Sequence, residues 1–280
     1  MTVPLQLGIR AHDLGQHPID ELIKKMEDYD FSHAHFAMKK SFPESVNTIQ
    51  KMTPGTANYF QSRFAKAGLK ISILGSYVNI VATDLDERKQ AIADFKHHIH
   101  LARDFGASMV ATETGSVGKG YTEENFTEEA FQKAVVSVKE MVAEAERFGV
   151  IVAIESGINH PVYTAPLAKR LVDEVNSPNL KIILDCANLM SVSNYKNQAE
   201  VIKEAFELLD DHLIALHIKD FIVEDDKIKI VPVGHGWMEY EEIMRYAKYQ
   251  KPHIYTSLEA TTEPHLADSI KLIKSIYDKV

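Results

Sequence analysis

The sequence predicts a single α/β domain, a (β/α)₈ TIM barrel that extends over residues 1–280. Eight short apolar segments alternate with longer amphipathic segments, no linker or low-complexity stretch divides the chain, and the length suits one barrel. An open, doubly wound sheet is the main alternative, and it usually has a glycine-rich turn after its first strand. Here residues 10–15 read RAHDLG, without the GxGxxG spacing, which favours the barrel.

The eight predicted strands are short, rich in Ile, Val and Leu, and have few turn residues in their interiors. Strands that helices cover on both faces have this composition. In chain order they are residues 5–9, 34–38, 71–74, 109–112, 151–155, 182–185, 213–217 and 254–259. Because a helical segment separates each strand from the next, we expect parallel pairing in a closed sheet.

Apolar residues at intervals of three or four predict helices between the strands. The clearest periodic sets cover residues 19–26, 92–102, 131–142 and 266–277. Gly68, Gly106 and Gly149 each follow a helical segment and precede a strand, where a left-handed cap is expected. Thr53 followed by Pro54 is typical of a helix start.

Charge and composition exclude several classes of protein. The formal net charge is −9, whereas nucleic-acid-binding surfaces usually carry a basic stripe, so we expect no nucleic-acid partner. Cys186 is the only cysteine, which excludes an intrachain disulfide. No apolar stretch approaches the roughly 20 residues that span a bilayer, and the N-terminus does not resemble a signal peptide. We therefore expect a cytoplasmic protein with no membrane partner.

Four consecutive predicted strands end in a side chain that can bind a metal. These residues are Glu155, Asp185, His217 and Glu259. One such residue alone is usually a solvated loop residue or a helix cap, but four in succession at the functional end of a barrel suggest a site. Three carboxylates and one imidazole suit one divalent cation, Mn²⁺ most of all, with Mg²⁺, Co²⁺ or Zn²⁺ as alternatives. The cation would also neutralise acids that are costly to bury.

The alternation of side chains along a strand predicts what lies below this site. If the four residues point into the barrel, so do the residues two positions earlier in each strand. These are Ala153, Ile183, Ala215 and Ser257, three of which are small. The expected floor is tightly packed and shallow.

Several segments resemble the xylose isomerase-like superfamily of sugar and sugar-phosphate isomerases and epimerases. They are LGSYVN (74–79), TETGS (112–116), IESG (154–157), LDCANLM (184–190), HIKD (217–220), VGHGWMEY (233–240) and SLEA (257–260). The resemblance covers nearly the whole barrel. It implies that Glu155, Asp185, His217 and Glu259 are the metal ligands.

The resemblance also implies a reaction and a partner. The metal would bind two neighbouring oxygens of an open-chain sugar or sugar phosphate and stabilise an enediolate. Glu155 and Glu259 would be the catalytic acid and base on opposite faces of this small molecule, while Asp185 and His217 mainly hold the metal. A homo-oligomer is possible.

Five further residues are candidates for substrate binding: Glu113 and His160 after the fourth and fifth strands, Asn188 after the sixth, His235 between two glycines, and Lys40 after the second. Asn188 stands where many members of the family have a histidine. Lys40 could meet a phosphate, although a solvated lysine is the commoner meaning. His160 and His235 could equally be loop and turn residues.

Other functions stay open. Related barrels dehydrate cyclitols or keto acids, so a metal-dependent lyase is the main alternative. An arginine that ketose 3-epimerases commonly have after the seventh-strand histidine is absent between His217 and Val233. An apurinic-endonuclease-like hydrolase would need extra histidines where this chain has Tyr77 or Asn79, Glu113 and Asn188, and it is less favoured. A non-catalytic binding protein would not need all four ligand types.

Overall fold

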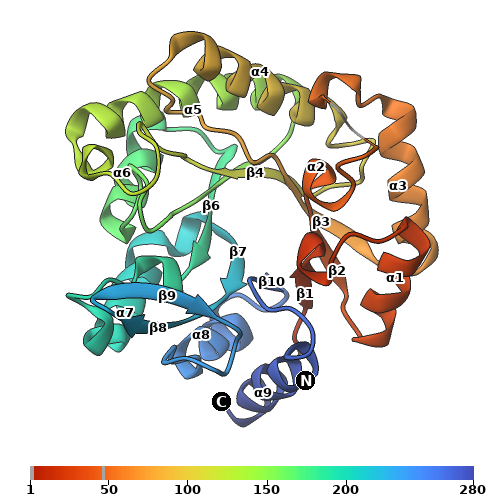
Figure 1. Cartoon of the computed structure of the whole chain (residues 1–280), viewed down its shortest axis with the longest axis vertical. Coiled ribbons are helices and arrows are strands. Elements are labelled where there is room, and N and C mark those ends of the chain that lie inside the picture. The colour runs from red at the N-terminus through yellow and green to blue at the C-terminus, as the bar shows by residue number, and fades with distance from the viewer. Residues whose placement is uncertain (1–2, 46–47) are drawn as a thin grey trace.

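Eight parallel strands form the centre of the molecule (Figure 1). They are β1 (Leu7–Arg10), β2 (His33–Phe36), β3 (Lys70–Gly75), β4 (Met109–Glu113), β5 (Val152–Glu155), β6 (Leu180–Asp185), β7 (Leu213–Ile218) and β10 (Tyr255–Leu258). The computed structural model describes residues 3–45 and 48–280, and in it these strands close into a barrel in the order β1-β10-β7-β6-β5-β4-β3-β2. The predicted (β/α)₈ fold is confirmed.

Helices surround the barrel. They are α1 (Ile19–Asp28), α2 (Met38–Ser41), α3 (Pro54–Lys66), α4 (Leu85–Leu101), α5 (Glu128–Phe148), α6 (Ala165–Val175), α7 (Gln198–Leu209), α8 (Glu241–Arg245) and α9 (Leu266–Lys279). The predicted signals act as expected: Thr53 caps α3 by accepting from the backbone N–H of Thr56, and Gly149 ends α5 with a φ of 64°. None of the described helices is long and apolar enough to cross a membrane.

The structure departs most clearly from the strand predictions in two places. The second strand was expected to reach Met38, but β2 ends at Phe36 and Met38 begins α2. An antiparallel hairpin, β8 (Asp220–Glu224) and β9 (Lys227–Val231), was not predicted, although β8 contains the apolar run 221–223 and β9 alternates lysine with isoleucine. Asp225 and Asp226 form its turn with φ values of 50° and 53°, the positive values that a two-residue hairpin loop requires.

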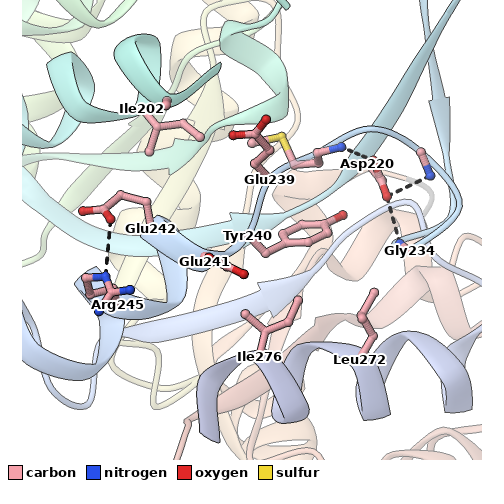
Figure 2. A pocket seen from close by; sticks show the side chains of 13 residues that line it. Ile202, Asp220, Gly234, Glu239, Tyr240, Glu241, Glu242, Arg245, Leu272 and Ile276 are labelled. Carbon is pink, nitrogen blue, oxygen red and sulfur yellow. Dashed lines mark hydrogen bonds and ion pairs between the residues drawn. The ribbon is translucent and has the colours of Figure 1, made fainter. Parts of the chain in front are cut away.

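A buried aspartate anchors the loop that follows this hairpin. Asp220 Oδ1 accepts hydrogen bonds from the amides of Phe221 and Met238, and Oδ2 accepts from those of Gly234 and Gly236 (Figure 2). A carboxylate that accepts several backbone N–H groups is well compensated for its burial. This arrangement fixes the backbone directly after the seventh barrel strand.

The barrel interior is filled as the side-chain alternation predicted. Its apolar floor consists of Ile73, Met109, Ala111, Ala153, Ile183 and Ala215. Two histidines of β2, His33 and His35, are also buried. A Cβ on Gly8 would lie 2.4 Å from the ring of His33, and one on Gly75 would lie 2.7 Å from that of His35. Glycine at both positions therefore makes room for the imidazoles.

A cavity of about 590 Å³ lies outside the barrel, between α7, α8 and α9 (Figure 2). Ile202, Leu272 and Ile276 give it apolar walls, and Glu242 pairs with Arg245 at 3.5 Å on α8. It contains none of the four predicted metal ligands, so the chemistry must be sought elsewhere.

Phe36 is the centre of an aromatic cluster between β2 and the helices. Its ring lies 5.4 Å from Phe64, 5.5 Å from Phe60, 6.0 Å from Phe42 and 6.1 Å from Phe105, measured between centroids. Aromatic pairs at such distances stabilise a core beyond the area that they bury. The cluster holds β2 against α3.

We expect Phe36→Ala to lower the free energy of unfolding by about 3–5 kcal/mol, because it leaves a cavity in this cluster. Urea denaturation followed by circular dichroism measures the loss. Tyr59→Ala is the matched control on α3, since Tyr59 is exposed, and it should cost roughly 1 kcal/mol or less. Equal losses in the two variants would contradict the assignment.

Candidate metal centre

The four predicted ligands converge at the C-terminal mouth of the barrel. Glu155 and Asp185 end β5 and β6, His217 lies near the end of β7, and Glu259 directly follows β10. The parallel register places Asp185 opposite His217. Each of the four offers a ligand atom within 4.8 Å of the others, and all four side chains are buried. The cluster could therefore hold a metal ion.

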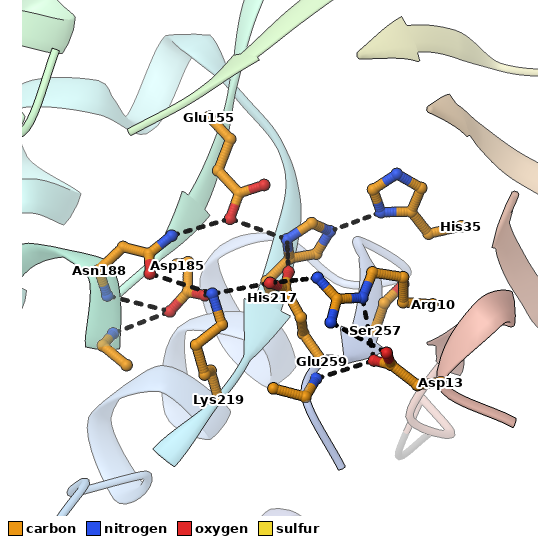
Figure 3. Close-up of polar contacts among 12 residues, drawn as sticks. Arg10, Asp13, His35, Glu155, Asp185, Asn188, His217, Lys219, Ser257 and Glu259 are labelled. Carbon is orange, nitrogen blue, oxygen red and sulfur yellow. Dashed lines mark hydrogen bonds and ion pairs between the residues drawn. The ribbon is translucent and has the colours of Figure 1, made fainter. Parts of the chain in front are cut away.

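His217 lies between the two glutamates (Figure 3). Its Nδ1 is 3.1 Å from Glu155 Oε1 and 2.9 Å from Glu259 Oε2. Neither approach has the geometry of a hydrogen bond, so this buried nitrogen has no hydrogen-bond partner among the described residues. A buried polar atom without a partner is costly. A cation at this point would pair with that nitrogen and with the surrounding carboxylates, so the donor set fits a divalent metal.

The opposite side of the His217 ring faces a second histidine. His217 Nε2 lies 3.2 Å from Nδ1 of His35, and both rings are buried. Burial lowers the pKa of His35 well below its ordinary value, which keeps that ring neutral. If His217 binds a metal through Nδ1, its Nε2 carries the proton and donates to His35, a contact that fixes the orientation of the ligand.

Lys219 supplies a positive charge within the cluster. Its Nζ is 2.9 Å from Asp185 Oδ2 and 2.7 Å from Glu259 Oε1, and it donates to Asn188 Oδ1 at 3.0 Å. Burial opposes the charge, but Asp185 and Glu259 outweigh burial and raise the pKa of Lys219 well above its ordinary value. Lys219 is therefore an ammonium at neutral pH.

Arg10 supplies a second positive charge. Its guanidinium donates to Glu259 Oε1 at 2.7 Å and holds Asp13 through two hydrogen bonds of 3.0 and 2.9 Å. Asp13 in turn accepts from the amide of Ala260 at 2.8 Å. These contacts connect the ends of β1 and β10 and fix Glu259 from the side away from Lys219.

The metal-free cluster retains protons at neutral pH. Burial raises the pKa of Glu155 to about 7, although His217 opposes the shift. Burial alone would lower the pKa of His217, but the carboxylates of Glu155 and Glu259 raise it to about 10. Glu259 differs: burial would raise its pKa, yet Lys219, His217 and Arg10 hold it well below the ordinary range. The two glutamates therefore have different environments.

Three of the predicted substrate-binding residues lie around the cluster. Asn188 donates to Glu155 Oε1 at 3.1 Å. Glu113 ends β4 opposite Glu155 in the register and is half-buried. His160 packs over Gly157 and accepts from the amide of Gly115 at 3.3 Å, and burial lowers its pKa.

The remaining two candidates lie further out. Lys40 is exposed on α2, with its Nζ 5.6 Å from the centroid of the Tyr77 ring. His235 is exposed in the turn after β9, and its ring packs edge-on against His265 with centroids 4.4 Å apart. The structure brings neither residue into contact with the four-residue cluster, and their roles stay predictions.

Sequence reasoning missed Lys219, Arg10 and His35 as site residues. Lys219 follows His217 by two positions, so the alternation of side chains could have placed it on the same face. Arg10 is the last residue of β1, and the predicted strand ended one residue earlier. His35 lies within β2, where no local pattern indicates a contact with a distant histidine.

Fold and site together define a (β/α)₈ barrel with a buried cluster that could hold a metal ion. More particularly, the chain belongs to the xylose isomerase-like TIM barrel family, whose model matches residues 23–276. A comparison with curated proteins gives no significant sequence match.

Solved structures with the same fold cover almost the whole chain. A D-tagatose 3-epimerase-like protein has a TM-score of 0.77 at 17% identity, over 99% of this chain and 98% of its own. The probable 3-DHS dehydratase AsbF of Bacillus anthracis has a TM-score of 0.74 at 16% identity, over 98% and 99%. A xylose isomerase-like TIM barrel protein of Mycobacterium smegmatis in complex with magnesium has a TM-score of 0.70 at 18% identity, over 99% and 97%. At these identities the likeness shows the fold alone.

We expect the purified protein to bind about one divalent ion per chain. Glu155→Gln or His217→Ala should weaken metal binding by more than about 100-fold, which exceeds the usual loss when a residue that only contacts a metal ligand is changed. Calorimetry and elemental analysis measure affinity and occupancy. Glu113→Gln is the matched control, because Glu113 ends a neighbouring strand outside the cluster. Full occupancy in both ligand variants would refute the ligand assignment.

Metal binding should release protons and strengthen with pH. With a pKa of about 10, His217 must lose a proton before Nδ1 can bind a cation, and below pH 7 Glu155 must lose one as well. Apparent affinity should therefore rise roughly tenfold per pH unit above neutrality, with about one proton released per ion at pH 8 and close to two at pH 6. Calorimetry in buffers of different ionisation enthalpy counts the protons. Affinity that does not change between pH 7 and 8.5 would contradict these pKa directions.

Proposed function

We propose that this protein is a divalent-metal-dependent isomerase or epimerase of a small sugar or sugar phosphate. The observation that carries the proposal is the buried convergence of three carboxylates and one imidazole at the barrel mouth, where His217 Nδ1 lacks a hydrogen-bond partner among the described residues. Family membership and the epimerase-like structural relative support the same class of reaction. The acidic composition and the single cysteine suit a cytoplasmic enzyme without a nucleic-acid partner.

Glu155, Asp185, His217 and Glu259 would hold the ion. When bound, it would supply Lewis acidity to two neighbouring substrate oxygens and so acidify the carbon next to the carbonyl. The hard carboxylate oxygens suit Mn²⁺ or Mg²⁺, and we favour Mn²⁺ because an imidazole completes the set. A magnesium complex exists for one structural relative.

Glu155 is suited to remove the proton from the substrate carbon. Its Oε1 faces Asn188 and His217, whereas no described residue pairs with Oε2 (Figure 3). A general base needs one such free oxygen within reach of the substrate. Asn188 orients the carboxylate by donating to Oε1, and its amide is itself held through Lys219 and the carbonyl of Ser156.

Glu259 would act from the other side of the substrate. Both of its oxygens already have charged neighbours, with Arg10 and Lys219 at Oε1 and His217 at Oε2. A proton returned on this side would pass from the Lys219 ammonium to Glu259 and then to the carbon. Solvent would afterwards reprotonate Lys219, and Glu155 would release to solvent the proton that it removed. Return of the proton to the face opposite Glu155 inverts the carbon centre, as an epimerase requires.

A metal-dependent lyase is the second candidate, and Lys219 is the observation that favours it. A dehydratase needs a group that protonates the departing hydroxyl. The Lys219 ammonium lies among Asp185, Glu259 and Asn188, within the same cluster as the ligands. The probable 3-DHS dehydratase has the same fold, so a cyclitol or keto acid is the alternative substrate.

A panel of ketoses, their phosphates and cyclic keto acids, incubated with Mn²⁺ in D₂O and analysed by mass spectrometry, tests the proposal. We expect one substrate to gain deuterium at the carbon next to the carbonyl with no loss of water. Loss of water from the product would favour the lyase instead. No exchange and no product from any member would contradict both reactions.

With that substrate, Glu155→Gln should slow deuterium exchange by at least about 100-fold, the usual contribution of a general base. Glu259→Gln should reduce product formation by a similar factor while leaving measurable exchange, because Glu155 still removes the proton. Both variants are assayed at saturating Mn²⁺ with metal occupancy verified. Exchange at the wild-type rate in fully occupied Glu155→Gln would remove Glu155 from the mechanism.

A further inference from the structure

The loop after β3 brings the ring of Tyr77 next to His35, the histidine that contacts His217. Among residues 3–45 and 48–280, no group makes a hydrogen bond to the hydroxyl of Tyr77. The charged side chains that influence its pKa are Glu259, Arg10, Glu155 and Glu113. Burial raises the pKa of Tyr77 well above its ordinary value, so the phenol stays protonated and can donate.

The Tyr77 ring is held in place by two histidines. His35, which contacts the ligand His217, stacks on it with centroids 5.9 Å apart and an angle of 10° between the planes. His12 meets it edge-on at 5.7 Å, with an angle of 90°. A ring packed in this way gives a rigid wall that continues outward from the ligand histidine.

Lys40 lies at the outer side of this wall. Its Nζ is 5.6 Å from the centroid of the Tyr77 ring, and the described residues include no carboxylate paired with it. His12 is close enough to be affected by both Arg10 and Lys40, and its buried Nδ1 has no hydrogen-bond partner. An unpaired ammonium and an unpaired imidazole nitrogen thus border the same ring.

The charges of the inner cluster are already balanced without Lys40. Once a divalent ion is bound, its charge together with Arg10 and Lys219 matches the four carboxylates of Asp13, Glu155, Asp185 and Glu259. The charge of Lys40 therefore remains available for a ligand. Because β3 lies between β2 and β4, Lys40 and the acidic Glu113 approach Tyr77 from opposite sides.

We propose that Tyr77, His12 and Lys40 form a substrate subsite, in which the tyrosine hydroxyl donates to a substrate hydroxyl or carbonyl oxygen and Lys40 binds a terminal anionic group. The inference rests on the proposed function and specifies its substrate as a sugar derivative with a phosphate or a carboxylate at the end remote from the metal. A charge-assisted contact at that end also fixes the distance from the anion to the reacting carbons.

Binding of unreactive probes tests the subsite separately from catalysis. Arabinitol, arabinitol 5-phosphate and arabinonate have neither an aldehyde nor a ketone, so they cannot isomerise. Calorimetry measures their affinity for the metal-loaded protein. We expect one of the two anions to bind wild-type protein at least about tenfold more tightly than the neutral polyol. The preferred anion distinguishes a phosphate from a carboxylate substrate.

Lys40→Met should abolish the preference for the anionic probe over the neutral polyol. Lys39→Met is the matched control on the same helix. It should retain the preference, because Lys39 is exposed and outside the subsite. Tyr77→Phe should weaken all three probes by a similar factor, about 3–10-fold for one hydrogen bond, with metal affinity unchanged. A preference that survives in Lys40→Met, or no preference in wild-type protein, would overturn the subsite. Neither result depends on whether the enzyme isomerises any sugar, so the two proposals fail separately.

Discussion

The structure depends on bringing three carboxylates together in a buried space at one end of a barrel. Like charges at such distances repel strongly and lose hydration, so the arrangement requires positive charge. The chain supplies part of it through Lys219 and Arg10, which contact the acids directly. Without metal, protons on His217 and Glu155 supply the rest. A divalent ion would replace those protons and would give the cluster a charge that does not depend on pH.

The barrel makes this concentration of charge possible because its strands fix the side chains independently of one another. Each of the four residues lies at the end of a different strand, and the hydrogen-bond ladders between strands resist the repulsion. Small residues such as Ala153 and Ala215 fill the floor, while Gly8 and Gly75 make room for His33 and His35. His35 then orients the ligand ring. Packing below the mouth thus determines which nitrogen of His217 faces the carboxylates.

The sequence predicted the fold and the four converging residues because both depend on local patterns. A buried strand is visible in the sequence as an apolar run, and the last residue of that run lies at the C-terminal mouth of the barrel. Contacts made by long side chains across the mouth have no such signature. Arg10 reaches Glu259 and His35 reaches His217 from strands that are distant in sequence, and Tyr77 approaches from a loop. The β8–β9 hairpin differs again, because its two short strands form a separate sheet outside the regular alternation of strands and helices that predicts the barrel.

The same cluster can support isomerisation and dehydration because both reactions begin with loss of a proton beside a carbonyl. They differ in what happens next: an isomerase returns a proton to carbon, and a lyase gives one to a departing oxygen. In this chain the Lys219 ammonium is the donor that either step could use, since Asp185, Glu259 and Asn188 hold it within the cluster. From that position it could give a proton to carbon through Glu259, or to an oxygen that leaves the substrate. The position of the substrate relative to Lys219, more than the metal-binding residues, therefore distinguishes the two reactions.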